Sequence, residues 1–473
     1  YARGFYDRLP AALLEAVKRA GERGGMILGR EALSELARRH ALCPFELSLE
    51  LAKLSDVAVG DYNYVYDPFV SIEALLGVPG GAALLVDEAH QLAPRVRDAL
   101  SAEIGGEELA GLRREIGRAH GRRIPLYRAL TGAIGALEAA AQDPAFGEGR
   151  LAEPPAALGE AMELVLETAS AQLAAGGVQA DADAFSLAAS FRLAQARFDE
   201  RYALLSGGEG RCARLSLLCL NAAPEILEQS KRARGTAYFS ATLAPLNAAR
   251  RMLGSEEGDA CLALPSPFRA EQLEARVAPI DIRYAARERT APQVAEAIAR
   301  QLGGHAGNAL VFFPSYAYLA HIAERIEGME NGPDIALLRE KRGMTEEEKA
   351  ALLAVFGEED GRAALFAVLG GAFAEGIDLP GRMLQNVIVV STGLPQPDER
   401  IRAMQAYYDR QGEDGFDLCM TLPGMVRVIQ AAGRLIRTDT DTGSLLLIDS
   451  RFARPRERAL LSGTLIGDAL GIR

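Results

Sequence analysis

Several patterns that would classify a protein at once are missing from this sequence of 473 residues. No apolar run approaches the roughly 18–20 residues of a membrane-spanning helix, and the first residues lack the pattern of a secretory signal peptide. The 5 cysteines are widely scattered without a CxxC pair, so neither a disulfide framework nor a zinc site is indicated. These absences predict a cytoplasmic protein with no membrane partner.

A phosphate-binding loop is missing as well. No glycine is followed by lysine, so the pattern GxxxxGK followed by serine or threonine does not occur. The first residue is Tyr1 rather than methionine. From both observations we expect this sequence to be a fragment of a longer protein.

The overall composition is that of a globular protein with more than one domain. Of the residues, 49% are hydrophobic and 25% are charged. The length exceeds the roughly 250–300 residues at which a single core stops growing. The net charge of −12 argues against a broadly basic surface, so we expect any nucleic-acid contact to be confined to a groove.

The stretch AALLVDEAHQL at 82–92 organises the rest of the sequence. Four apolar residues, 83–86, predict a strand buried on both faces, and Asp87 and Glu88 follow at its carboxyl end. Ligands of open α/β sheets bind beyond that end. There an aspartate can hold the Mg²⁺ of a nucleoside triphosphate, and a glutamate can orient the attacking water. A strand that ends in a solvated acidic turn is the alternative.

The segment before this strand is predicted to be mainly helical. Helical periodicity runs through 7–40 with a turn at 21–25, a helix is expected over 45–54, and a short buried strand over 57–59. Cys43 precedes that helix, and an aromatic cluster (Tyr62, Tyr64 and Tyr66) follows that strand. The ordinary interpretation is that Cys43 is a small buried apolar residue and that the tyrosines are part of the core.

Beyond this stretch the sequence becomes helical and then returns to alternating strands and helices. Residues 96–205 show helical composition without a convincing strand, which predicts a helical insertion at 96–210 with its ends close together. Strands are expected at 215–220 and 236–239, the latter ending in Ser240-Ala241-Thr242. Further strands at 309–313, 364–368, 387–390 and 445–448 predict a second parallel sheet.

Two later segments carry polar residues typical of a phosphate site. GGAFAEGIDLPG at 370–381 places glycines where the backbone can approach a ligand, beside Glu375 and Asp378. In QAAGRLIRT, Gln430, Arg434 and Arg437 have i, i+4, i+7 spacing, which predicts that they share one helix face. Always-charged, fork-shaped donors suit a developing phosphate charge; an exposed basic helix is the alternative.

DEAH, SAT, VFFPSYAYL, GAFAEGIDLPG and QAAGRLIR, in this order, closely resemble motifs II to VI of superfamily 2 helicases. More narrowly, the set resembles the DEAH-box, iron–sulfur-containing XPD/DinG-like group. The segment 41–68 is similar to the part of that family that leads from its last cluster cysteine into the first motor domain. The resemblance covers nearly the whole chain and implies two RecA-like parallel-sheet motor domains, with an arch-like helical insertion in the first.

The resemblance also implies a role for each matching residue. Asp87 would bind Mg²⁺, Glu88 would activate water, and Gln430, Arg434 and Arg437 would reach the γ-phosphate of ATP. Gly376 and Asp378 would line the nucleotide cleft. His90, Ser240 and Thr242 would couple nucleotide state to the DNA track. The residues implied to contact single-stranded DNA are Ser315, Tyr316, Tyr62 and Tyr64.

The resemblance implies an ATP-dependent helicase of DNA repair type with 5′→3′ polarity, acting on single-stranded or forked DNA. In that family the phosphate-loop lysine and three cluster cysteines would precede Tyr1, leaving Cys43 as a lone ligand of a 4Fe–4S cluster that needs four. We therefore expect the cluster only in the full-length protein and no ATPase activity from the fragment. A non-hydrolysing DNA-binding scaffold, or a related motor acting on RNA or protein, are the alternatives.

These inferences define a domain scheme. Residues 1–45 are a remnant of the iron–sulfur domain, 46–95 and 211–272 form the first motor domain, 96–210 form the insertion, and 273–473 form the second motor domain. Asp87 and Glu88 are expected to converge with Gln430, Arg434 and Arg437 on one cleft. Cys43 is expected to lie far from the other four cysteines.

Overall fold

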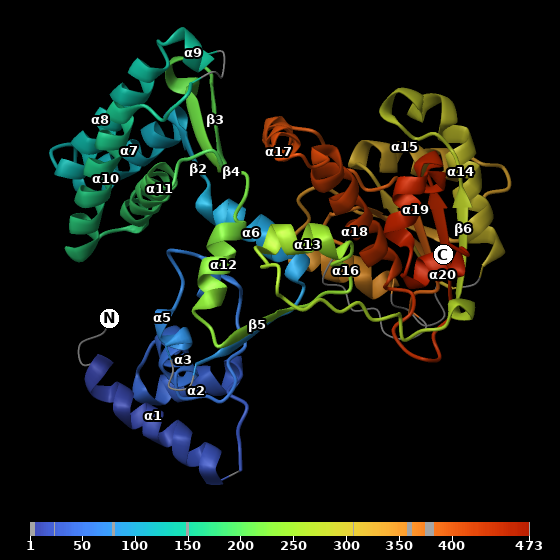
Figure 1. Cartoon of the computed structure of the whole chain (residues 1–473), viewed down its shortest axis with the longest axis horizontal. Coiled ribbons are helices and arrows are strands. Elements are labelled where there is room, and N and C mark those ends of the chain that lie inside the picture. The colour runs from blue at the N-terminus through green and yellow to red at the C-terminus, as the bar shows by residue number, and fades with distance from the viewer. Residues whose placement is uncertain are drawn as a thin grey trace. The chain divides into compact units, whose positions relative to one another are not determined.

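The computed structural model describes residues 5–22, 24–77, 81–147, 151–305, 307–356, 362–373 and 383–472. The chain forms two compact units (Figure 1). Unit 1 comprises Tyr1–Ala241 and Arg251–Ser255, and unit 2 comprises Thr242–Arg250 and Glu256–Arg473. None of the helices in these described ranges is long and apolar enough to cross a membrane.

Unit 1 begins with a small helical cluster. Its amphipathic helices bury Leu36, Leu47 and Leu51 against one another. The cluster is formed by α1 (Phe5–Glu22), α2 (Arg30–His40) and α3 (Pro44–Ala52), and two short helices follow it, α4 (Asn63–Tyr66) and α5 (Glu73–Leu76). The strand predicted at 57–59 does not form: within the part of the chain that the structure describes, this segment pairs with no strand, and Val57 and Val59 are 78% and 98% exposed.

A pair of parallel strands carries the central stretch of the sequence. β1 (Ala83–Val86) pairs with β5 (Gly235–Tyr238), with Val86 opposite Tyr238. The prediction that β1 is buried on both faces was wrong: Leu85 is 76% exposed. An apolar run indicates that a strand can be buried. Whether it is buried depends on which segments pack against it.

The insertion is a helix bundle packed beside a second, antiparallel sheet of order β2–β4–β3 (Figure 1). The expectation that 96–205 contains no strand was wrong, because β2 and much of β3 fall in it. The predicted strand at 215–220 exists, but it lies at the centre of this antiparallel sheet. The ends of the insertion therefore meet there, not at the sheet of β1 and β5.

The elements of this part follow one another along the chain. They are α6 (Leu92–Leu100), β2 (Ala102–Gly105), α7 (Gly106–His120), α8 (Pro125–Ala140), α9 (Pro144–Gly147), α10 (Ala156–Ala174), α11 (Gln179–Ala196), β3 (Tyr202–Gly207), β4 (Arg214–Cys219) and α12 (Ala223–Lys231).

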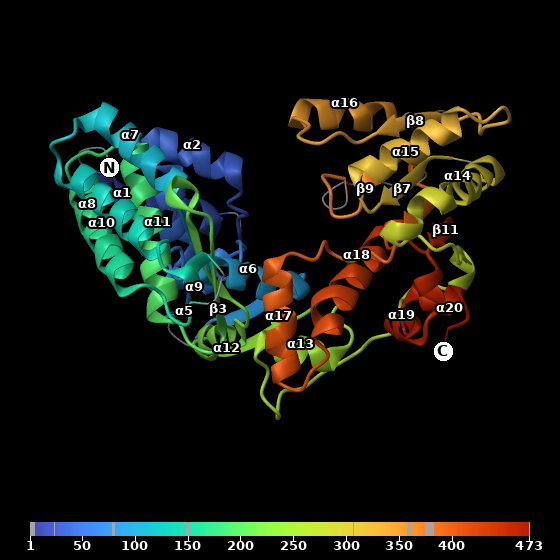
Figure 2. The same ribbon diagram turned by 90° about the horizontal axis from the view of Figure 1, so that it is seen from above.

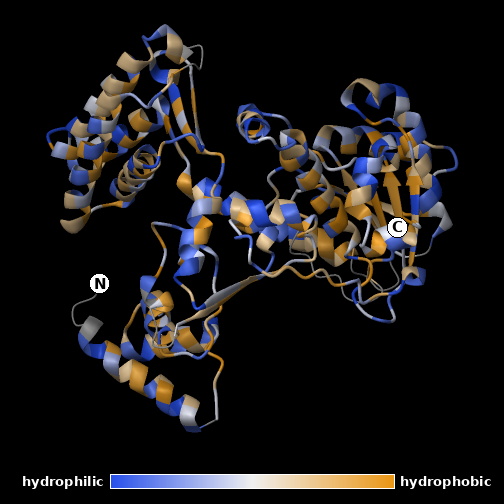
Figure 3. Ribbon diagram, in the orientation of Figure 1, coloured by the Kyte–Doolittle hydropathy of each residue, from blue (hydrophilic) through white to orange (hydrophobic). Residues whose placement is uncertain are grey.

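Unit 2 is built on a six-stranded parallel sheet of order β6–β11–β10–β7–β9–β8. Every residue of β7 and β10 is buried, and Figure 3 shows strands of this sheet as strongly hydrophobic. The parallel sheet expected from the sequence is confirmed, with β6 and β8 as additional strands. Apolar runs without alternation are typical of strands covered on both faces.

Helices cover both faces of this sheet (Figure 2). Helices α14 and α15 pack on one face, and α16, α18, α19 and α20 contribute to the core on the other. The elements are α13 (Leu246–Leu253), β6 (Leu273–Ala278), α14 (Arg287–Gly304), β7 (Ala309–Phe313), α15 (Tyr316–Glu327), β8 (Ala336–Arg339), α16 (Glu346–Phe356), β9 (Ala363–Val368), β10 (Asn386–Val390), α17 (Glu399–Arg410), α18 (Leu422–Ala432), β11 (Gly443–Ile448), α19 (Pro455–Leu461) and α20 (Leu465–Ala469).

Candidate functional site

In unit 1 the candidate site lies where β1 and β5 end side by side. The backbone pairing continues past both strands: Phe239 N–H donates to Val86 O at 3.0 Å, and Ala89 N–H donates to Phe239 O at 3.1 Å. Because parallel strands end at the same edge, this pairing brings the DEAH and SAT segments together.

Glu88, His90 and Ser240 form a polar cluster at this edge. The Ser240 hydroxyl donates to Glu88 Oε2 at 3.0 Å and lies 2.9 Å from His90 Nδ1. The Glu88 side chain is 54% exposed, whereas that of His90 is 12% exposed. One carboxylate oxygen of Glu88 is thus oriented by a residue from the neighbouring strand while the group stays open to solvent. An exposed, oriented carboxylate can position a water molecule.

The backbone at Glu88 adopts an unusual conformation. Its φ of 47° lies in the left-handed region, which a residue with a side chain rarely occupies. Asp87 Oδ1 accepts a hydrogen bond from Glu88 N–H at 2.7 Å. Asp87 is exposed, and a carboxylate at such a position fits the Mg²⁺ of a nucleotide, which takes one or two protein carboxylates in addition to phosphates.

Tyr62 contacts this turn, although no sequence pattern indicated the contact. Its hydroxyl donates to Asp87 O at 2.5 Å and to Glu88 O at 3.1 Å. The guanidinium of Arg95 lies over the ring, 5.3 Å from its centroid. Partial burial raises the pKa of Tyr62, which keeps the hydroxyl a donor. Tyr64 packs near Phe45, with ring centroids 6.5 Å apart. A role of either tyrosine in DNA stacking stays a prediction.

Cys43 is exposed at the start of α3, so its interpretation as a small buried residue was wrong. Among the described residues, no group of three or more His, Cys, Asp or Glu side chains could hold a metal ion. A 4Fe–4S cluster takes four thiolates, and one thiol does not fit that requirement.

In unit 2 the predicted phosphate-binding residues do not share a helix face. Helix α18 ends at Ala432, so Gln430 lies on the helix, Arg434 in the turn after it, and Arg437 in an extended segment. Glycine at 433 weakens the helix, and burial of Leu435 and Ile436 turns the chain into the core. Asp441 fixes the new direction by accepting from the backbone N–H of Arg437 at 2.8 Å. The expected helical spacing was therefore wrong.

The two predicted groups lie in different units. Asp87 and Glu88 belong to unit 1, and Gln430, Arg434 and Arg437 belong to unit 2. Their convergence on one cleft stays a prediction. Thr242 is 5% exposed and is grouped with unit 2, and its role in coupling nucleotide state to the DNA track also stays a prediction.

A buried carboxylate, Glu340, joins two loops of unit 2, and sequence reasoning missed it. Only 3% of Glu340 is exposed; its Oε1 accepts from the Tyr316 hydroxyl and from Ala372 N–H, both at 2.9 Å. Its Oε2 accepts from Val368 N–H at 2.8 Å. Tyr316, predicted to touch DNA, is thereby connected to the start of the glycine-rich segment. An isolated glutamate after a short strand carries no sequence signal of this role.

The other predicted residues of unit 2 divide into two kinds. The Ser315 hydroxyl accepts from Tyr318 N–H at 3.3 Å and caps α15, which leaves its contact with a nucleic acid a prediction. Gly376 and Asp378 lie outside the described residues. A β-carbon added at Gly371, shortly before them, would lie 2.6 Å from Glu340 Oε1. The loop therefore requires glycine at this position.

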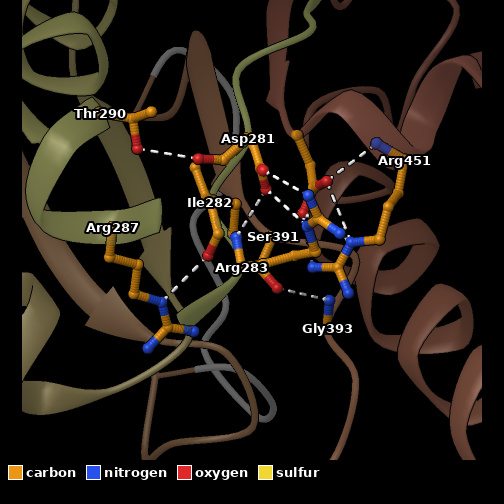
Figure 4. A network of polar contacts seen from close by, with 9 residues as sticks. Asp281, Ile282, Arg283, Arg287, Thr290, Ser391, Gly393 and Arg451 are labelled. Atoms are coloured by element: carbon orange, nitrogen blue, oxygen red, sulfur yellow. Dashed lines mark hydrogen bonds and ion pairs between the residues drawn. The ribbon is translucent and has the colours of Figure 1, made fainter. Parts of the chain in front are cut away.

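A basic cavity of about 590 Å³ lies beyond the carboxyl ends of β6, β10 and β11. Its lining residues are Arg283, Leu394, Phe416, Thr421, Arg451, Arg454, Pro455, Arg456 and Glu457. Figure 4 shows how Asp281 and Arg283 pair at one wall, 2.7 Å apart, near Arg451. Arg283 holds the pKa of Asp281 well below its usual range. Three lining arginines are also paired with carboxylates: Arg283 with Asp281, Arg451 with Asp449, and Arg456 with Asp414 and Asp417. Among the lining arginines, Arg454 beside an aromatic ring therefore suits a phosphate and a base best.

Two protein families match this chain. The Helicase C-terminal domain family matches residues 298–466, and the DEAD_2 family matches residues 12–109. ATP-dependent DNA helicase YoaA of Escherichia coli is 26% identical over 423 residues, which is 84% of this chain and 64% of that protein. ATP-dependent DNA helicase DinG of Photobacterium profundum is 27% identical, over 48% of this chain and 33% of that protein.

The human putative ATP-dependent DNA helicase DDX11-like protein 8 is 28% identical over 56% of this chain. The chain spans only 32% of that protein. A solved XPD helicase structure superimposes with a TM-score of 0.61 over 94% of this chain and 77% of that one, at 16% identity. A second, an apo XPD structure, gives a TM-score of 0.56 at 15% identity.

The sheets, the motif positions and these matches define a superfamily 2 helicase-type protein with two RecA-like motor domains and a helical insertion in the first. Within that class, the chain belongs to the XPD/DinG-like group.

Proposed function

We propose that this chain is the motor part of an ATP-dependent DNA helicase of DNA repair type that moves 5′→3′ on single-stranded or forked DNA. The observation that supports this most is the Glu88 carboxylate at the carboxyl end of β1, held at 3.0 Å by Ser240 from the neighbouring strand. That geometry links a candidate water-orienting group to a second motif through a single hydrogen bond.

In this mechanism residues of both motor domains act on ATP. Asp87 would hold the Mg²⁺ that accompanies ATP, and the bound ion supplies charge neutralisation at the phosphates. Glu88 orients the water that attacks the γ-phosphate. Gln430, Arg434 and Arg437 would stabilise the charge that develops on it, and Gly376 and Asp378 are proposed to contribute to nucleotide binding.

DNA binding is assigned to other residues of unit 2. Ser315 and Tyr316 follow β7, and the basic cavity follows β6, β10 and β11, all at carboxyl ends of one parallel sheet. Arginines there would contact phosphates, and aromatic rings would stack on bases without reading sequence. The contacts from His90 to Ser240, and from Tyr316 to Glu340, are the routes by which DNA would influence hydrolysis.

Steady-state ATP hydrolysis with and without single-stranded DNA tests this proposal. It is measured on the 473-residue chain and on the protein encoded by the complete reading frame. We expect DNA-stimulated turnover from the longer protein only if it supplies a phosphate loop, and none from the chain alone. A complete protein that binds DNA without hydrolysing ATP would instead be a scaffold, and stimulation by RNA alone would indicate an RNA motor.

Polarity is tested separately. Duplexes with a single-stranded 5′ or 3′ tail are unwound with ATP and Mg²⁺ by the complete protein. We expect unwinding of the 5′-tailed duplex. Preference for the 3′ tail would leave the helicase assignment in place and reverse the polarity.

A further inference from the structure

The DEAH turn needs external support because its conformation is costly. Glu88 sits at φ 47° without being glycine, and residues with a side chain rarely adopt this conformation because the β-carbon is crowded against the backbone. Nearby backbone bonds hold part of the turn, including Gln91 N–H to Glu88 O at 2.9 Å. These bonds leave the carbonyl of Asp87 for another donor.

Tyr62 supplies that donor from a segment about 25 residues away in the sequence. Its hydroxyl reaches the carbonyl oxygens on both sides of the strained residue, at 2.5 Å to Asp87 and 3.1 Å to Glu88. A single hydroxyl therefore fixes two consecutive peptide planes, and those planes set the direction of both carboxylates.

The tyrosine is itself held in place. Arg95 lies over its ring and pairs with Asp61 at 3.3 Å, the residue immediately before Tyr62. Ring and guanidinium together restrict the hydroxyl to one position. Tyr62 lies just before α4, whose Tyr66 lies 3.2 Å from Ser230, so this segment is joined to the domain at a second point.

We propose that Tyr62 is a positioning residue for ATP hydrolysis: its hydroxyl holds the Asp87–Glu88 turn in the geometry that Glu88 needs to orient water. This inference rests on the proposed ATPase function. It gives the hydroxyl a role that is separate from stacking of the ring on DNA, because phenylalanine would preserve the stacking.

The test compares Tyr62→Phe with Tyr127→Phe, which removes a hydroxyl from a half-buried tyrosine on α8 of the insertion. ATP turnover is measured on the complete protein. Since one hydrogen bond contributes about 1 kcal/mol, we expect Tyr62→Phe to lower kcat roughly fivefold to tenfold, with KM for ATP and DNA affinity within about twofold. Tyr127→Phe should match the unchanged protein.

A second readout is independent of ATP. Amide hydrogen exchange of the 473-residue chain should speed up about fivefold in the peptide covering 86–91 with Tyr62→Phe, while the unfolding midpoint stays constant. An unchanged kcat despite faster exchange would overturn the positioning role and leave the helicase proposal intact. Unchanged exchange in this peptide would overturn the claim that the Tyr62 hydroxyl holds the Asp87–Glu88 turn. A complete wild-type protein without ATPase would refute the proposed function, and the hydrolytic role of Tyr62 with it.

Discussion

The two parallel sheets differ in how they hold the loops at the carboxyl ends of their strands. In unit 2, β7 and β10 are fully buried, and the loops at their carboxyl ends rest on an apolar core that covers both faces. In unit 1, Val86 is the one buried residue of β1, and the DEAH turn is held by discrete hydrogen bonds from Ser240, Phe239 and Tyr62. The loops of unit 2 are therefore positioned by core packing together with the buried carboxylate of Glu340, whereas the turn of unit 1 depends mainly on polar contacts.

This difference predicts distinct consequences of mutation. In unit 2, mutation of a loop residue that is packed in the core should lower the free energy of unfolding. Mutation of a loop residue outside that packing should lower ATP turnover without affecting stability. In unit 1, mutation of a residue that holds the DEAH turn should change the orientation of Asp87 and Glu88 more than it changes the free energy of unfolding.

The largest effect is expected from Arg434→Ala in the complete protein. Removing an arginine that stabilises transition-state charge should lower ATP turnover by roughly 10³–10⁵-fold. The folding of unit 2 and its affinity for DNA should persist, because other loops carry those functions. Steady-state ATPase and DNA-binding assays measure this. Arg300→Ala, at a 77% exposed side chain of α14, is the control; a loss below tenfold for Arg434→Ala would contradict the assignment.

Amide exchange should separate the two sheets directly. Amides of Val311 and Ile388 in the fully buried strands should exchange roughly 10²–10³-fold more slowly than those of Leu85 and Thr236 in the β1–β5 pair. Exchange followed by mass spectrometry on the 473-residue chain measures the difference. Equal protection of both sheets would remove the contrast on which this comparison depends.

Glu340→Ala should destabilise unit 2. It removes the shared, buried acceptor of Tyr316, Val368 and Ala372, and the loss of these three partly buried hydrogen bonds should cost about 3 kcal/mol. Denaturant unfolding measures the loss, with Glu296→Ala at an exposed position of α14 as the control. Equal stability of both variants would show that Glu340 does not hold the loop.

The smallest effect is expected at the basic cavity. Arg454→Ala should weaken binding of single-stranded DNA a few-fold and reduce the slope of log K against log salt by about 0.7, the value for one lost phosphate contact. Arg458→Ala is the control, because Arg458 lies on helix α19, which begins immediately after Arg454, but is not among the cavity-lining residues. An identical salt dependence of the two variants would exclude the cavity from the DNA track.

Local sequence patterns predicted the parts of the fold that depend on local burial. The five apolar residues of β7 were predicted with the observed bounds, since a buried parallel strand needs only a continuous apolar run. The short strand β2 was missed because alternation over four residues is too brief to recognise. The strand expected at 57–59 was wrong because pairing depends on a partner that the segment itself does not encode.

In the candidate site, too, the sequence predicted some of the residues and missed others. Motif order located Asp87, Glu88, His90 and Ser240, and the structure brings the last three together. The contact of Tyr62 with the turn joins residues about 25 positions apart, and that of Glu340 with Ala372 joins residues 32 apart, with no periodicity between them. The end of α18 at Ala432 was missed because a continued helical spacing was assumed through Gly433.

The measurement that tests the account most directly is ATP turnover by the complete protein carrying Glu88→Gln, with and without single-stranded DNA. The amide keeps the size of the side chain and removes the carboxylate that orients water, so turnover should fall by about 10²–10⁴-fold. ATP and DNA binding should stay within about twofold, because Asp87 and the loops of unit 2 are unchanged. DNA-stimulated turnover close to that of the unaltered protein would contradict the central claim that Glu88 activates the hydrolytic water.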